Sequence, residues 1–154
     1  MRKKIFSAKL ACIELPLTQE YDCPPSREAR MLNTAKIIAF VPIRDSELSR
    51  PFYEEVLGLR FVSDDPFALV MNSNGVMVRL AKTPKFTPAG FTIMGWEVSA
   101  IEEAVAALKK KGVKFEKFPG LPQDESGIWA APGGAKVAWF KDPDGNILSL
   151  SQHV

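Results

Sequence analysis

The sequence of 154 residues is long enough for one globular domain with a substantial hydrophobic core. Its 46% hydrophobic and 25% charged residues are typical of a soluble globular protein, and its formal net charge of +2 gives no reason to expect a nucleic-acid partner. No apolar stretch reaches the roughly 20 residues that a membrane-spanning helix needs, so we expect no membrane partner either.

Residues 1–33 differ in character from the rest of the chain. They hold both cysteines, Cys12 and Cys23, and a polar, proline-bearing stretch without hydrophobic periodicity. We therefore expect a loop-like N-terminal extension, followed by a single domain over residues 34–154. Two thiols outside that domain make no disulfide framework, and Lys9 and Glu14 interrupt the apolar stretch after the basic N-terminus. For these reasons we expect a cytoplasmic protein rather than an exported one.

The pattern becomes regular in residues 35–82, the first predicted module. A nearly continuous apolar stretch at 37–43 predicts a strand that is covered on both faces. Asp45 or Ser46 can cap a helix that ends at Gly58, and Pro51 predicts a kink or a late start in that helix. Three short strands are predicted next, at 59–63, 67–72 and 76–81, and a tight turn joins the last two.

The same order returns in residues 91–152, the second predicted module. The pattern predicts a strand at 91–98, a helix at 100–111, and strands at 113–117, 127–131, 136–140 and 147–151. The last two strands form a hairpin in whose turn Pro143 sets φ and Gly145 takes positive φ, while the aspartates accept hydrogen bonds from nearby backbone N–H groups. This repetition indicates an internal duplication of a βαβββ unit.

The chain resembles the vicinal oxygen chelate superfamily in its two βαβββ halves and in two stretches, FYEEVLGL (52–59) and FKDPDGN (140–146). That superfamily contains glyoxalase I, extradiol dioxygenases, and the fosfomycin and bleomycin resistance proteins. The resemblance covers residues 35–152 and implies an α+β fold. In it, two tandem βαβββ modules form a cupped, mixed but mostly antiparallel sheet around a cavity, with helices on the outer face. It also implies a homodimer, because a second chain often completes the cup.

Members of that superfamily typically hold a divalent metal through His, Glu or Gln at one inward position on each of four strands. By the resemblance, these positions fall in this chain on Ile38, Arg79, Ile93 and Ser149. Two are apolar, one is a cation and one is a neutral hydroxyl, so none is a competent ligand for a divalent ion. The only histidine in the chain is His153. We therefore expect a protein without a metal and without another cofactor.

Side-chain alternation predicts a mostly apolar cup that carries one cation, one carboxylate and a few hydroxyls. The predicted ligand-binding residues are Ile38, Phe40, Met77, Arg79, Ile93, Glu97, Trp129, Trp139 and Ser149. Positions of the opposite parity, among them Ala39, Val78, Met94 and Trp96, are expected to face the helices. A buried guanidinium needs an anionic partner, so Arg79 either binds an anionic ligand or pairs with Glu97. Trp129 and Trp139 either present aromatic faces at the mouth of the cup or pack in its core or rim.

Two functions from different classes follow from this pattern. The first is a metal-independent binding protein that sequesters or senses a small organic ligand, which is anionic if Arg79 binds it. The second is a lyase, isomerase or dioxygenase of the glyoxalase type with an atypical site, using Glu97 as a base or an unrecognised metal site. A third alternative is a structural subunit whose cup is filled by its own side chains or by the N-terminal arm. No catalytic residue is assigned, because the sequence carries no nucleophile constellation.

Overall fold

The structure is a computed structural model, and it describes residues 32–154. The chain divides into two compact units, residues 1–35 and residues 36–154, which are considered separately. In the described end of the first unit, the backbone N–H of Ala35 donates to the carbonyl of Leu32 at 3.2 Å. The remainder of the expected N-terminal extension lies outside the described residues. None of the helices in residues 32–154 has the length and apolar character to cross a membrane.

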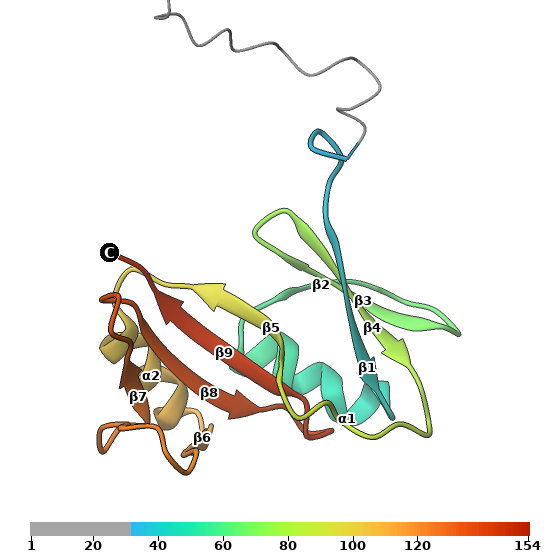
Figure 1. The fold of residues 1–154 in the computed structure, drawn as a ribbon. Coiled ribbons are helices and arrows are strands. Elements are labelled where there is room, and N and C mark those ends of the chain that lie inside the picture. Colours follow the sequence, from blue (N-terminus) through green and yellow to red (C-terminus); the bar gives the residue numbers. More distant parts are fainter. Residues whose placement is uncertain (1–31) are drawn as a thin grey trace, which may run out of the picture. The chain divides into compact units, whose positions relative to one another are not determined.

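The first module forms a four-stranded sheet in the order β1-β4-β3-β2 (Figure 1). Its elements are β1 (Ile38–Ile43), α1 (Ser46–Pro51), the π-helical segment η2 (Phe52–Val56), β2 (Arg60–Asp64), β3 (Ala68–Ser73) and β4 (Val76–Lys82). Strands β1 and β4 are parallel, and the other neighbours are antiparallel. Asn74 and Gly75 both have positive φ in the turn between β3 and β4, which is the tight hairpin that the sequence predicts.

The second module repeats this topology with a sheet in the order β5-β9-β8-β6, to which β7 is added beside β8. Its elements are β5 (Thr92–Glu97), α2 (Ile101–Lys110), β6 (Phe115–Glu116), β7 (Ile128–Ala130), β8 (Lys136–Lys141) and β9 (Ile147–Gln152). The parallel pair β5–β9 corresponds to β1–β4. Gly145, with a φ of 90°, occupies the place that Gly75 has in the first module. The predicted α+β fold of two βαβββ modules is therefore confirmed, with strand ends within two residues of those expected.

Pro51 changes the pitch of the first helix. The helix begins where the sequence predicts it, because the Asp45 side chain accepts a hydrogen bond from the backbone N–H of Glu47 at 2.8 Å. Pro51 is the last residue of the α-helical part, and the chain continues in a π-helical turn in which Leu57 N–H donates to the carbonyl of Phe52 at 2.9 Å. The disturbance expected from the proline is thus a wider turn rather than a late start.

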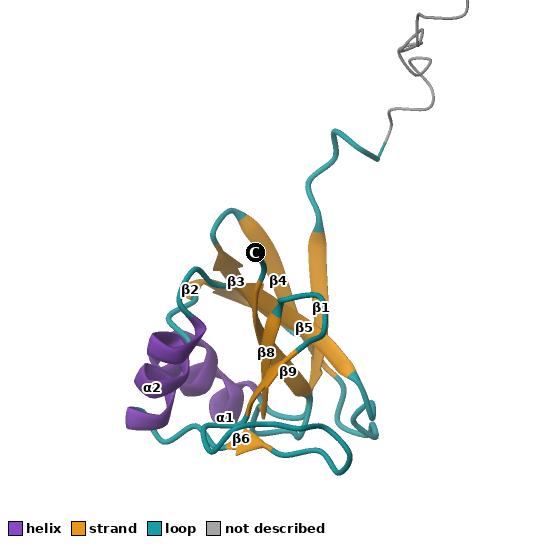
Figure 2. Ribbon diagram, turned by 60° about the vertical axis from the view of Figure 1, so that its left-hand side comes forward, coloured by secondary structure: helices purple, strands orange, loops and turns teal. Residues whose placement is uncertain are grey.

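Both sheets and both helices share one hydrophobic core. The sheets contribute Val41, Ile43, Leu69, Met71, Val78, Leu80, Ala138, Phe140, Leu148 and Leu150, and the helical segments contribute Tyr53, Ile101 and Val105. Figure 2 shows the two helices together on one side of the strands. Because one face of each sheet belongs to this common core, the opposite face of each sheet points away from it.

The carboxylate of Asp142 connects the two modules. It is only 5% exposed and accepts a hydrogen bond from the hydroxyl of Tyr53 at 2.7 Å, while Asn146 donates to it from its side chain and from its backbone, each at 2.8 Å. The Asn146 side chain also donates to the carbonyl of Pro42 at the end of β1. Burial raises the pKa of Tyr53, and the negative charge of Asp142 raises it further, so this hydroxyl stays a donor.

Asp144 adds a second set of contacts between the same turn and the first module. Its carboxylate accepts hydrogen bonds from the Ser49 hydroxyl at 3.1 Å and from the backbone N–H of Arg44 at 3.2 Å, and it pairs with the Arg44 guanidinium at 3.1 Å. The guanidinium also donates to the carbonyl of Phe86 in the linker between the modules. The turn between β8 and β9 therefore holds the β1–α1 junction of the first module and the linker between the modules. We call this set of contacts, centred on Asp142 and Asp144, the turn clamp.

Replacing Tyr53 with phenylalanine should destabilise the protein. The change leaves the buried carboxylate of Asp142 without one of its donors, and we expect the free energy of unfolding to fall by about 1–3 kcal/mol. Urea denaturation followed by circular dichroism measures this. The matched control is Glu116→Gln, which removes a partly exposed ion pair with Lys141 and should change stability by less than about 0.5 kcal/mol. Equal unfolding curves for wild type and Tyr53→Phe would contradict the importance of the clamp.

Candidate functional site

The face of the first sheet that lies away from the helices carries four of the predicted site residues. Ile38 lies opposite Met77, and Phe40 lies opposite Arg79, in the parallel register of β1 and β4. The three apolar members are exposed to solvent, Ile38 by 46%, Phe40 by 62% and Met77 by 40%. These side chains form an apolar surface on the face that the sequence predicts to line the cup, and we call it the first cup face.

Arg79 is the one cation at the centre of the first cup face. Its guanidinium lies 3.4 Å from the carboxylate of Asp65, which is a long ion pair, and 29% of its side chain is exposed. Hydrogen bonds from the backbone N–H groups of Phe67 and Ala68, helped by Arg79, keep the pKa of Asp65 below its usual value. Glu97, the alternative partner considered from the sequence, instead lies 3.2 Å from His153. Arg79 thus retains guanidinium donors that can meet an anion.

The second sheet presents Trp129, Trp139 and Ser149 on its face away from the helices. Trp139 lies opposite Ser149 in the register of β8 and β9, and Trp129 lies opposite Val137 on the same face. The two indole rings stack with centroids 6.1 Å apart and an interplanar angle of 29°. The Trp139 indole N–H donates to the hydroxyl of Thr92 at 3.0 Å, which fixes the ring. This aromatic surface, the second cup face, suits a planar apolar ligand.

Ser149 lies directly against the backbone of β5. It is opposite Gly95 in the parallel register, and a Cβ atom on Gly95 would lie 2.4 Å from the Ser149 hydroxyl oxygen. A side chain at position 95 would therefore force the Ser149 hydroxyl to move. The close approach was not predicted, although an isolated glycine within a strand is a sequence signal for such a contact.

Ile93 takes a position that strict alternation did not predict, whereas Glu97 shares the face of Gly95 and Ser149 as expected. The register between β5 and β9 shifts between Thr92 and Met94, so Ile93 sits at a β-bulge, and it packs against the shared core. The side chain of Glu97 is 73% exposed at the end of β5. Of the nine predicted site residues, eight lie on or beside the two cup faces, and Ile93 is turned toward the core.

The four strand positions that hold a metal in the superfamily that this chain resembles do not form a metal site here. Their occupants are Ile38, Arg79, Ile93 and Ser149, which offer no imidazole and no carboxylate. Within the part of the chain that the structure describes, no group of three or more His, Cys, Asp or Glu side chains could hold a metal ion. The residues present therefore do not fit a divalent ion.

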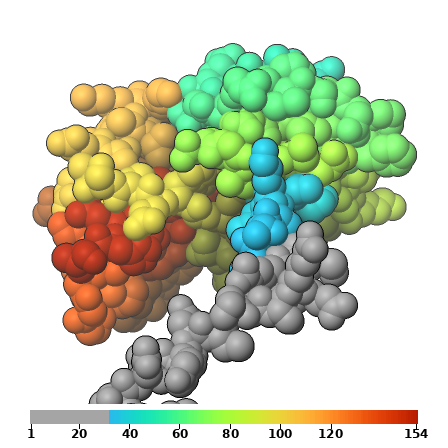
Figure 3. Space-filling view, turned by 90° about the horizontal axis from the view of Figure 1, so that it is seen from above, coloured from blue at the N-terminus to red at the C-terminus, as the bar shows by residue number. Residues whose placement is uncertain are grey.

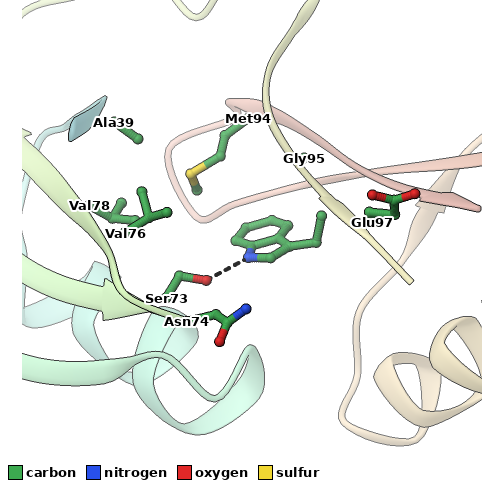
Figure 4. Close-up of a pocket in the computed structure, with 9 residues that line it drawn as sticks. Ala39, Ser73, Asn74, Val76, Val78, Met94, Gly95 and Glu97 are labelled. Atoms are coloured by element: carbon green, nitrogen blue, oxygen red, sulfur yellow. Dashed lines mark hydrogen bonds between the residues drawn. The ribbon is translucent and has the colours of Figure 1, made fainter. Parts of the chain in front are cut away.

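A cavity of about 470 Å³ lies between the two modules and involves residues that the sequence reasoning assigned to packing. It is lined by the β3–β4 hairpin and by parts of β1 and β5, and among its lining residues are Met94, Trp96 and Glu97 (Figure 4). Seen from above, the segment of β5 adjoins the segment of β3 and β4 (Figure 3). Alternation places Met94 and Trp96 on the helix side of their strand, but no residue of a helix lines this cavity. Its position depends on how the modules meet, which local sequence does not encode.

Comparison with known proteins gives one family. The profile of the Glyoxalase/Bleomycin resistance protein/Dioxygenase superfamily matches residues 35–150. No curated protein matches the sequence. The solved structure of a member of that superfamily from Sphaerobacter thermophilus DSM 20745 is 27% identical, with a TM-score of 0.62, and the match covers 77% of this chain and 97% of that chain.

Two further solved structures share the fold at lower identity. One is TnmS3, an antibiotic binding protein from Streptomyces sp. CB03234, with 23% identity, a TM-score of 0.60, and coverage of 80% of this chain and 99% of that chain. The other is a bleomycin resistance determinant encoded on the transposon Tn5, with 21% identity, a TM-score of 0.62, and coverage of 78% and 98%. At these identities the likeness concerns the fold alone.

Replacing Gly95 with alanine should destabilise the protein by about 1–3 kcal/mol, because the new methyl group overlaps the Ser149 hydroxyl. The loss should be smaller when Ser149 is also alanine, since the nearest side-chain atom is then the Cβ of residue 149, at 3.7 Å. A double-mutant cycle by urea denaturation measures this coupling. Gly90→Ala is the control, because a Cβ there meets nothing within 4 Å. Additive effects of the two substitutions would contradict the proposed contact.

Proposed function

Because the chain belongs to the Glyoxalase/Bleomycin resistance protein/Dioxygenase superfamily, we propose that it binds a small organic molecule without a metal ion, in a cup that two copies of the chain build together. The observation that carries this proposal is the replacement of the superfamily's metal ligands. The four positions hold two isoleucines, an arginine and a serine, and such a set recognises an organic ligand rather than a cation. Binding is one use to which this fold is put, since TnmS3, which shares it, is an antibiotic binding protein.

The exposed first cup face supports a homodimer. Ile38, Phe40 and Met77 form an apolar surface that water covers in the single chain, and such surfaces commonly mark interaction sites. The cup faces of the two sheets point away from the core that the modules share, so they do not close on each other within one chain. In the proposed dimer, the first cup face of one copy lies opposite the second cup face of the other, and the ligand lies between them.

The two cup faces together predict the chemistry of the ligand. Trp129 and Trp139 offer a stacked aromatic surface, while Arg79 offers guanidinium donors beside apolar neighbours. A planar or largely apolar molecule with one anionic group meets both requirements, because a half-buried guanidinium binds a carboxylate or phosphate through charge-assisted hydrogen bonds. The form of the enzymatic alternative that uses Glu97 as a buried base has no support, because the side chain of Glu97 is 73% exposed.

Native mass spectrometry of the purified protein tests the dimer and the absence of metal together. We expect a mass of twice 17.0 kDa without a bound metal ion. Phe40→Glu should yield a monomer, because it places a charge in the proposed interface. Leu48→Glu, which alters an equally exposed side chain on α1, should remain dimeric. A stoichiometric Zn, Ni, Fe or Mn ion would overturn the metal-free proposal, and a wild-type monomer at micromolar concentration would overturn the shared cup.

Replacing Arg79 with alanine should weaken the binding of an aromatic anion. With 2-naphthoate as the probe, we expect the dissociation constant to rise about tenfold, which corresponds to about 1.4 kcal/mol. Binding of the neutral analogue 2-naphthalenemethanol should be unchanged, and so should binding of both probes to Arg50→Ala, whose arginine pairs with Glu54 on the first helical segment. Isothermal titration calorimetry measures all of these. Unchanged naphthoate affinity in Arg79→Ala would exclude Arg79 as the anion-binding group.

A further inference from the structure

The cavity between the modules is a second candidate binding site, separate from the cup. Its volume of about 470 Å³ is in the range that holds a small organic ligand, roughly 300–1,000 Å³. Neither Arg79 nor Trp139 lines it. Its lining residues come from β1, the β3–β4 hairpin, β4 and β5, and none of them belongs to a helix (Figure 4).

The walls of this cavity combine apolar side chains, a few polar groups and one fixed aromatic ring. Val76, Val78 and Met94 supply aliphatic and thioether surface. The indole N–H of Trp96 donates to the Ser73 hydroxyl at 3.0 Å, and the ring stacks on Phe140 at a centroid distance of 6.5 Å and an interplanar angle of 18°. The dashed line at Ser73 in Figure 4 marks this hydrogen bond, which links β5 to the β3–β4 hairpin. A ligand therefore meets a preorganised aromatic wall, which lowers the entropy lost on binding.

The charge of the cavity selects the ligand. Glu97 is the only ionisable residue that lines it, and the polar groups beside it are the Ser73 hydroxyl and the Asn74 amide. One Glu97 oxygen lies 3.2 Å from His153, and the other oxygen makes no hydrogen bond within residues 32–154. A carboxylate at the rim of an apolar, aromatic-walled space attracts a cation that also has an apolar body. It repels the anionic ligand proposed for the cup.

We infer that the cavity between β1, the β3–β4 hairpin and β5 binds a small organic ammonium ion. Its apolar or aromatic body lies against Met94, Val76 and Trp96, and its ammonium group pairs with the free oxygen of Glu97. The aromatic wall adds cation–π attraction to this ion pair. The site is independent of the proposed function, because it needs neither Arg79, nor the tryptophans of the second cup face, nor a second copy of the chain.

Titration with phenethylammonium chloride tests the assignment on the full-length protein. The protein contains 3 tryptophans, so the indole N–H signals in a ¹H–¹⁵N spectrum are few, and the Trp96 signal is identified by its loss in Trp96→Phe. We expect a saturable shift of the Trp96 signal. The neutral analogue 2-phenylethanol should bind at least about tenfold more weakly, because it lacks the charge that Glu97 recognises. Glu97→Gln should raise the dissociation constant of the ammonium ion about tenfold and leave that of the alcohol unchanged.

Three control variants make the outcome decisive. Glu116→Gln removes a carboxylate of the same sheet that does not line the cavity, and Arg79→Ala alters the cup; both should leave ammonium binding unchanged. Val76→Phe fills the cavity and should weaken binding of both probes. Equal affinity for the ammonium ion and the alcohol would overturn the assignment, as would an unchanged affinity in Glu97→Gln or Val76→Phe. Saturable shifts confined to the signals of Trp129 and Trp139 would also overturn it.

Discussion

The hydrogen bonds accepted by one buried carboxylate determine how the two halves of this protein meet. Asp142 binds the Tyr53 hydroxyl of the first module and the Asn146 side chain of its own turn, which in turn binds the Pro42 carbonyl. A carboxylate at this depth is costly unless each oxygen has donors, so the clamp forms completely or not at all. It therefore fixes one orientation of the second module against the junction of β1 and α1.

That orientation decides which surfaces remain free. Because the clamp lies where both sheets meet the helices, the helix-facing residues of both modules merge into one core around Tyr53, Ile101 and Val105. The opposite faces of the two sheets lie outside this core, and the apolar residues Ile38 and Phe40 stay exposed. In the proposed dimer, a second copy of the chain completes the cup over these exposed residues.

Strand β5 lies at the edge of its sheet and takes part in both candidate sites. Beyond the bulge at Ile93, Gly95 lies against Ser149, and residues 94–97 all line the cavity between the modules. The charges on the two sides are opposite in sign, Arg79 on the first cup face and Glu97 at the rim of the cavity. Opposite charges in separate apolar settings allow one small domain to distinguish an anionic ligand from a cationic one.

The local elements of this fold could be predicted from the sequence because their causes are local. Strand alternation, the Asp45 cap and the glycines at 75 and 145 each act within a few residues, and the internal repeat indicates that both halves share one topology. Once the resemblance assigns the four strand positions of the metal ligands, the residues that occupy them can be read directly from the sequence. The partner of Arg79, the bulge at Ile93 and the cavity beside Trp96 could not be predicted in this way. The first two depend on tertiary contacts within one module, Arg79 with Asp65 and β5 with β9. The cavity depends on the packing of one module on the other, which brings Trp96 to Ser73.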